Sequence, residues 1–224
     1  MIKYALLFIL IGGFGTFYWA SQSFKQGDQL ESLSTQHRST WVDETGKLHV
    51  MGIVLGQSTL RDAEVALRSR SQSAIYLHEE KTADNKKSFR LSLEAYFPSI
   101  ADHSKVILVL NVDKPLLIKM SERGTPPRVY PNGVVRINPS NEDILAVQKM
   151  TVKELRMLPS VQLNQAMLEG RFGKADSIKK SDDGSTRYLY PTIGLDALIK
   201  PEEKDILSFS TPRKNNQEKT ASPL

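Results

Sequence analysis

Cysteine is absent from this chain, and histidine is scarce, with four among 224 residues. Without a thiol there is no cysteine nucleophile, thiolate zinc site, cysteine-held iron–sulfur cluster, disulfide or lipidated cysteine anchor. The histidines at positions 37, 49, 78 and 103 are far apart, and no pair has the His-x-x-x-His spacing that places two imidazoles on one helical turn. We therefore expect no cofactor and no metal site.

The motifs of common enzyme classes are also missing. The sequence has no Walker loop, no dinucleotide-binding glycine fingerprint and no Gly-x-Ser-x-Gly elbow. Asp102, His103 and Ser104 are the residue types of a hydrolytic triad, but a triad converges from separate elements, whereas these three are adjacent. The pattern favours a turn in which Asp102 or Ser104 caps backbone groups. We expect a protein that is not an enzyme, and an exported hydrolase using Asp102, His103 or His78 is the alternative.

A strong excess of one charge sign is lacking as well. Thirty Lys and Arg stand against 25 Asp and Glu, a net charge of +5 that is spread along the chain. Such a balance does not indicate a nucleic-acid partner. The most concentrated basic stretch holds Arg123, Arg128 and Arg136 around two prolines and Tyr130. These four residues are our candidate surface for a partner or an anionic lipid, and a solvated connecting loop is the alternative.

Long hydrophobic runs are absent except for one, at residues 4–24, which carries no formal charge. At about 1.5 Å per residue, a helix of this length is roughly as long as the hydrocarbon core of a bilayer is thick. Lys3 precedes the run, and Tyr18 and Trp19 stand near its end, as in an anchor with its amino terminus inside. A cleaved signal peptide with Ser21 and Ser23 at the −3 and −1 positions is the alternative.

These features predict four regions. Residues 1–24 form a membrane anchor or signal segment, residues 25–40 a polar tether, residues 41–211 a folded α+β domain, and residues 212–224 a disordered tail. A bacterial envelope suits an exported domain without disulfides. We expect an inner-membrane protein with a single span and a periplasmic domain, or a periplasmic protein if the segment is cleaved.

Within the domain the pattern alternates between helical and extended segments. In the stretch 56–67, a Ser/Thr cap candidate followed by apolar residues at 60, 63 and 67 predicts a short amphipathic helix. Residues 141–150 are predicted to form a short helix or a turn, and residues 161–172 a helix with Leu163, Ala166, Met167 and Gly170 on one side. The sequence predicts a hairpin loop at 81–87, no helix between Arg123 and Pro139, and strands at 73–78, 90–97, 105–112, 116–120, 153–158, 176–180, 186–190 and 206–209.

The fold class is therefore α+β, with antiparallel sheets packed against short helices. A cluster of strands follows the first of these helices and again the helix at 161–172. One possible organisation of the domain is therefore two similar helix-plus-sheet units, 41–122 and 140–211.

One part of the sequence is similar to a known family. Arg171 to Asp176 end a helix, Asp183 and Gly184 make a turn, and the chain returns through Tyr188, Leu189, Tyr190 and Pro191. This order resembles the BamE/SmpA-like small envelope domain, and residues 52–59 resemble the entry to the first helix of such domains. The resemblance implies an envelope protein that supports assembly or partner binding by surface contacts and carries no catalytic residues.

The functional prediction is a membrane-anchored envelope protein whose periplasmic domain is a binding or assembly module. An exported hydrolase and a structural accessory subunit of a membrane complex are the alternatives. The expected partners are the membrane, through residues 4–24, and an envelope protein. We expect no nucleic acid, and the sequence identifies no small-molecule substrate.

Overall fold

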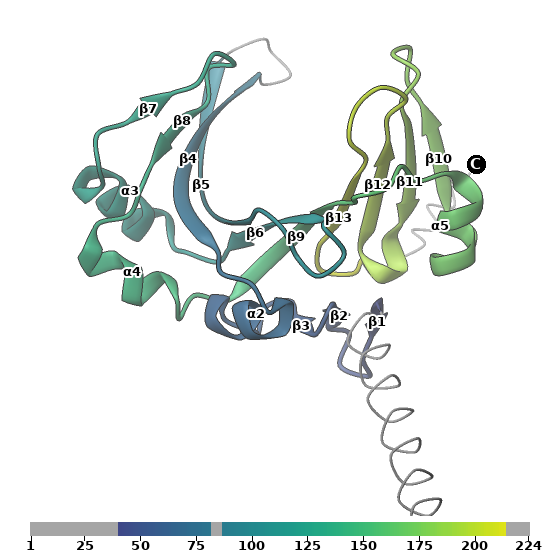
Figure 1. Ribbon diagram of the computed structural model, residues 1–224, viewed down its shortest axis with the longest axis horizontal. Coiled ribbons are helices and arrows are strands. Elements are labelled where there is room, and N and C mark those ends of the chain that lie inside the picture. Colours follow the sequence, from purple (N-terminus) through teal and green to yellow (C-terminus); the bar gives the residue numbers. More distant parts are fainter. Residues whose placement is uncertain (1–39, 82–86, 214–224) are drawn as a thin grey trace, which may run out of the picture. The chain divides into compact units, whose positions relative to one another are not determined.

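The computed structural model describes residues 40–81 and 87–213 (Figure 1). The predicted anchor at 1–24, the tether up to residue 39, positions 82–86 of the predicted hairpin loop and the tail beyond residue 213 lie outside this part of the chain. None of the helices within the described ranges is long and apolar enough to cross a bilayer.

Ten antiparallel strands form one continuous sheet, in the order β10-β11-β12-β13-β9-β6-β5-β4-β8-β7 (Figure 1). The strands are β4 (Gln72–Lys81), β5 (Lys87–Phe97), β6 (Lys105–Leu110), β7 (Arg128–Val129), β8 (Val135–Ile137), β9 (Val152–Leu158), β10 (Ser177–Lys180), β11 (Thr186–Tyr190), β12 (Leu195–Ile199) and β13 (Ile206–Phe209). The strands β1 (Thr40–Val42), β2 (Leu48–Val50) and β3 (Ile53–Val54) form a second, three-stranded sheet.

Four α-helices and one short 3-10 helix complete the described part of the chain. They are α2 (Leu60–Leu67), α3 (Lys114–Arg123), α4 (Asn141–Val147), α5 (Gln165–Phe172) and η1 (Pro191–Ile193). Local sequence sets the helix ends. Thr59 and Asp62 form a capping box at the start of α2, and Gly173 ends α5 with a φ of 81°.

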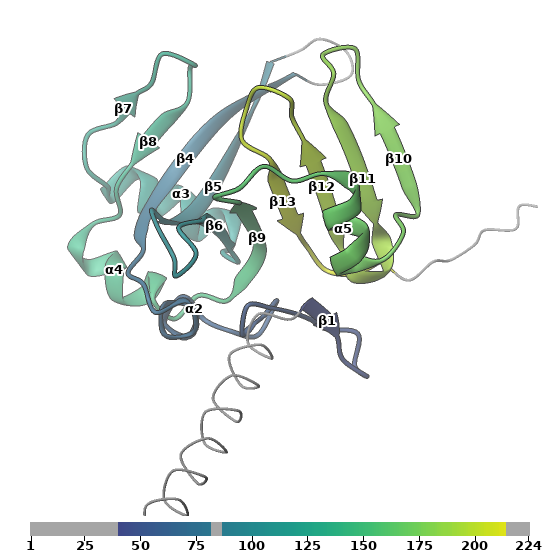
Figure 2. The ribbon, with the colours of Figure 1, turned by 45° about the vertical axis from the view of Figure 1, so that its right-hand side comes forward.

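One face of the large sheet is apolar and carries the core. Leu93, Phe97, Leu108, Leu155 and Phe209 are almost completely buried on this face. Residues of all four α-helices join the same cluster, including Leu60, Leu117, Val147 and Leu168, as do Leu48 and Val50 of the small sheet. The helices accordingly lie on this side of the sheet in both views (Figures 1 and 2).

The predicted α+β class with antiparallel sheets and short helices is confirmed. A helix followed by an antiparallel meander occurs in each proposed unit, α2 before β4 to β6 and α5 before β10 to β13. The strands of 41–122 and of 140–211 nevertheless belong to one sheet, because β6 pairs with β9 from Lys105 to Leu110. The similarity of the two halves stays a prediction.

The predicted strand at 116–120 is wrong, because these residues lie in α3. Pro115 occupies the first turn of the helix, where its missing N–H costs no hydrogen bond, and Leu117 and Met120 supply the i, i+3 pair that reaches the core. The helix predicted from 161 begins only at Gln165, after the cap Asn164. Its buried residue is Leu168, whereas Met167 is 46% exposed. Strand β12 and the small sheet have no counterpart in the sequence prediction.

Candidate functional site: the polar face of the sheet

The second face of the large sheet carries polar and aromatic side chains. Residues directly opposite each other on paired strands share a face, and the register places Tyr76 opposite Ser92, Glu94 opposite Val109, and Val109 opposite Glu154. We call the following set the polar face: Tyr76, His78, Ser92, Glu94, Tyr96, Glu154 and Arg156. No helix of the described residues lies on this side in Figure 1 or Figure 2.

A carboxylate lies at the centre of the polar face. Glu94 is 6% exposed although its side chain points away from the core. The Ser92 hydroxyl donates to Glu94 Oε1 at 2.9 Å, and Arg156 Nη1 lies 3.8 Å from the same oxygen. Arg156 Nε also donates to Glu154 Oε1 at 2.6 Å. Burial of Arg156 works against its charge, but Glu154 and Glu94 raise the pKa of its guanidinium overall. The network therefore links β5 to β9 through charged groups.

Two nitrogen atoms on or beside the polar face are buried without a hydrogen-bond partner, His78 Nε2 and Arg136 Nε. His78 Nε2 lies 3.5 Å from Glu94 Oε1 but makes no hydrogen bond, and the ring of His78 stacks on Tyr76 with centroids 6.0 Å apart. Burial raises the pKa of the Tyr76 phenol, against the charge of Arg136. The Nε of Arg136 is itself buried without a partner. Buried polar atoms without a hydrogen-bond partner are uncommon in folded proteins.

Three of the four predicted partner-surface residues meet at the edge of the polar face. Arg136 of β8 lies opposite Tyr76 of β4, and Arg128 of β7 lies opposite Arg136. The guanidinium carbon of Arg128 is 5.3 Å from the ring centroid of Tyr130. The turn between β7 and β8 passes through Gly133, whose φ of 80° is a conformation that glycine adopts without strain. Strands β7 and β8 also agree with the prediction that no helix forms between Arg123 and Pro139.

Arg123 does not join this surface. Its guanidinium is paired with Asp143, which is 5% exposed and also accepts a hydrogen bond from the Ser140 hydroxyl at 2.7 Å. The pair connects the end of α3 to the start of α4. Arg123 therefore has a structural contact that explains it without a partner.

The residues of the alternative hydrolase are not assembled. Asp102 Oδ1 accepts from the Ser104 N–H at 3.0 Å, as predicted for a capped turn, and Ser104 Oγ accepts from the Ser160 N–H at 3.2 Å. Asp102 and Ser104 border an apolar cavity of about 170 Å³ beneath α5, but neither His103 nor His78 is among its lining residues. His78 belongs to the polar face instead.

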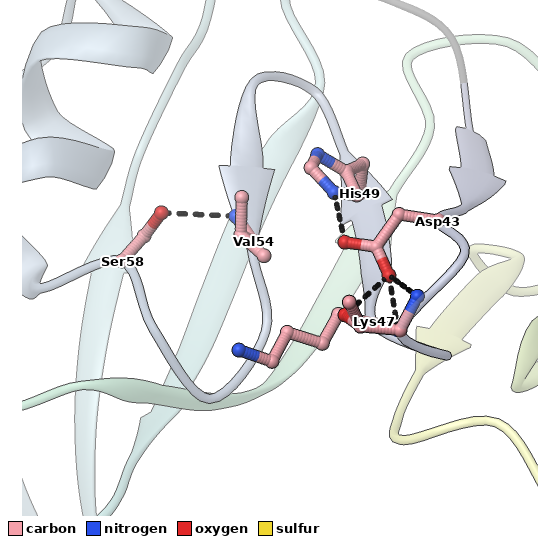
Figure 3. A network of polar contacts seen from close by, with 6 residues as sticks. Asp43, Lys47, His49, Val54 and Ser58 are labelled. Atoms are coloured by element: carbon pink, nitrogen blue, oxygen red, sulfur yellow. Dashed lines mark hydrogen bonds and ion pairs between the residues drawn. The ribbon is translucent and has the colours of Figure 1, made fainter.

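An Asp–His pair of a different kind lies in the small sheet (Figure 3). Asp43 Oδ1 accepts from the backbone N–H groups of Thr45 and Lys47, each at 2.9 Å, and Asp43 Oδ2 lies 3.0 Å from His49 Nε2. The His49 ring stacks on Trp41 with centroids 3.9 Å apart. Ser58 in the same view donates no hydrogen bond to this pair, since its hydroxyl accepts from the Val54 N–H at 2.9 Å. The Thr45 hydroxyl also donates to Asp43 Oδ1, at 2.7 Å, and together these contacts fix the β1–β2 turn.

Among the side chains that the structure describes, which do not include those of residues 79–81 and 87–88, there is no group of three or more His, Asp or Glu placed to hold a metal ion. Sequence analysis missed Tyr76 and Glu94 as site residues and named His78 only as a candidate of the alternative hydrolase. The signal was present in β5, where Ser92, Glu94 and Tyr96 alternate with the apolar residues of the core face. The resemblance to the BamE/SmpA-like domain stays a prediction, because comparison of this chain with protein-family models, curated proteins and solved structures gives no match.

Proposed function

We propose that this protein is a membrane-anchored envelope component whose folded domain binds another protein through the polar face of its sheet. The observation that carries the proposal is the polar face itself: it contains the buried carboxylate of Glu94, and no helix of the described residues covers it. Covering helices would be expected if this face served only to build the core, and its residues would then be apolar.

The composition of the face supports binding. Tyrosine and arginine are enriched in protein interfaces, and the face with its edge combines Tyr76, Tyr96, Tyr130, Arg128 and Arg136. The network around Glu94 holds Arg156 in place before any partner arrives, which lowers the entropy lost on association. The predicted span at residues 4–24 would place this surface in the envelope.

The location can be tested in a Gram-negative host that expresses the full chain with a carboxyl-terminal tag. We expect the intact chain in the membrane pellet after carbonate extraction, and digestion of its domain by protease added to spheroplasts. An intact chain in the soluble cytoplasmic fraction would contradict the proposal.

Binding can be tested with a photo-cross-linking amino acid at Tyr96, on the polar face. The matched control position is Leu145 of α4, which is 75% exposed and lies on the helical side. We expect a discrete cross-linked product from position 96 and none of the same mobility from position 145. Equal patterns from both positions would count against a binding role for this face.

A further inference from the structure

Arg128, Arg136 and Tyr76 form a row across three strands at the edge of the sheet, which we call the arginine row. The register places Arg128 directly opposite Arg136, and Arg136 directly opposite Tyr76. Side chains in directly opposite positions lie on the same face with their Cβ atoms about 5 Å apart. The side chains of Arg128 and Arg136 therefore start from neighbouring positions on one face, on adjacent strands.

Like charges in directly opposite positions destabilise a sheet unless a counter-charge lies nearby. Among the side chains that the structure describes, which leave out those of Glu79 and Glu80, no carboxylate lies within ion-pair distance of Arg128 or Arg136. Arg156 differs, because Glu154 and Glu94 neutralise it. Within the described side chains the arginine row is thus positive and without an ion pair, next to a network of two carboxylates, Glu94 and Glu154, and one guanidinium, Arg156.

The hydrogen bonding of Arg136 also indicates that a negatively charged group is missing. Its Nε is buried and lacks an acceptor. A carboxylate binds a guanidinium best through two parallel hydrogen bonds, one of which uses Nε. A carboxylate placed above the row, with a small rotation of the Arg136 guanidinium, would supply the missing acceptor and the missing negative charge together.

We propose that the arginine row binds an acidic segment of a partner protein, in which Asp or Glu side chains reach Arg136 and Arg128. This inference rests on the proposed function and names the chemistry of the partner. Tyr130, which packs on Arg128, and Tyr76, which borders Arg136, provide flat surfaces for the apolar parts of the same segment.

Burial favours a protein segment over a bilayer. Arg136 is half-buried on a strand, and its Nε has no exposed surface. A flat membrane meets the most protruding side chains first, whereas a carboxylate on a peptide side chain can extend down to the sheet.

The test uses the full chain in detergent and a short fluorescein-labelled peptide of alternating Glu and Ser, with a Gln and Ser peptide as its neutral counterpart. Anisotropy should show binding of the Glu peptide that weakens as salt is added, and weaker or absent binding of the Gln peptide. Arg128→Gln and Arg136→Gln should each weaken binding of the Glu peptide roughly tenfold or more, as expected for loss of a charged hydrogen bond. Arg61→Gln, which removes an equal charge from exposed Arg61 on α2, is the matched control and should bind as the unsubstituted chain does.

Thermal unfolding separates loss of binding from loss of folding. Because each substitution removes a like-charge contact, Arg128→Gln and Arg136→Gln should melt at the same temperature as the unsubstituted chain or higher. Unchanged binding in both variants would overturn the inference. The inference would also be overturned if the peptide failed to bind while anionic phospholipid vesicles bound in a manner that depends on Arg128 and Arg136. If the Glu peptide does not bind but position 96 still gives the discrete cross-linked product, this inference alone is overturned and the proposed function is not.

Discussion

At the scale of single residues, Asp43 is the group whose ionisation is most strongly tied to the fold. The hydrogen bond with His49 is the largest cause of a pKa far below the ordinary carboxyl value, and bonds from Thr45 and the Lys47 backbone act in the same direction. A carboxyl group whose pKa is lowered in the folded state stabilises that state above its unfolded pKa, and the stabilisation is lost as the pH falls through the folded-state pKa.

Asp43→Asn should therefore lower the urea midpoint at pH 7. The difference from the unsubstituted chain should shrink as the pH falls below 3.8, the ordinary carboxyl value. Urea titrations at pH 7, 5 and 3, followed by circular dichroism, measure both effects. Asp183→Asn is a useful comparison, because hydrogen bonds from Ser185 lower the pKa of Asp183 in a similar turn. A difference for Asp43→Asn that stays constant from pH 7 to pH 3 would contradict this account.

At the scale of elements, replacing two glycines in or beside helices by alanine should change the stability of the protein in opposite directions. Gly124 ends α3, and a Cβ there would collide with the Ile137 side chain and the Asn138 carbonyl oxygen, whereas a Cβ at Gly170 of α5 meets nothing within 4 Å. Gly124→Ala should destabilise the protein by about 1–3 kcal/mol, as overpacking does. Gly170→Ala should stabilise it by about 0.5–1 kcal/mol, because alanine loses less backbone entropy in a helix. Free energies of unfolding from urea titrations test the pair, and a loss of stability in both variants would contradict it.

Elements with strong local signals could be predicted from the sequence. The capped helix predicted in the stretch 56–67 corresponds to α2, and the strands predicted at 186–190 and 206–209 agree in their bounds with β11 and β13. Residues 116–120 could not be assigned, because a short apolar run fits a strand as well as a helix, and only packing on the sheet through Leu117 and Met120 decides between them. Strand β12 begins two residues after η1, and its sequence pattern did not predict a strand. It is a strand because it pairs with both β11 and β13.

The candidate site was harder to predict than the elements that carry it. Arg128, Tyr130 and Arg136 were found as a basic stretch, since they are near in sequence. Glu94 and Arg156 are 62 positions apart and meet only because β5, β6 and β9 are neighbours in the sheet. Strand order depends on contacts between distant segments, and a single sequence does not contain that information in local form.

At the scale of the whole molecule, the continuous sheet predicts one cooperative unfolding unit for residues 40–213. Among the described residues, the strands of 41–122 and of 140–211 are joined by the pairing of β6 with β9, and the isolated bridge between Thr59 and Thr151 adds a second β contact between the two ranges. Leu155 of β9 lies in this seam, fully buried and opposite Leu108 of β6. Leu155→Ala should cost about 2–5 kcal/mol by leaving a cavity, and should lower a single transition without splitting it. Circular dichroism and near-ultraviolet absorbance of the tyrosines, which occur in both halves, should give coincident urea curves for the full chain and for the variant. Two separated transitions would show instead that the halves fold as independent units.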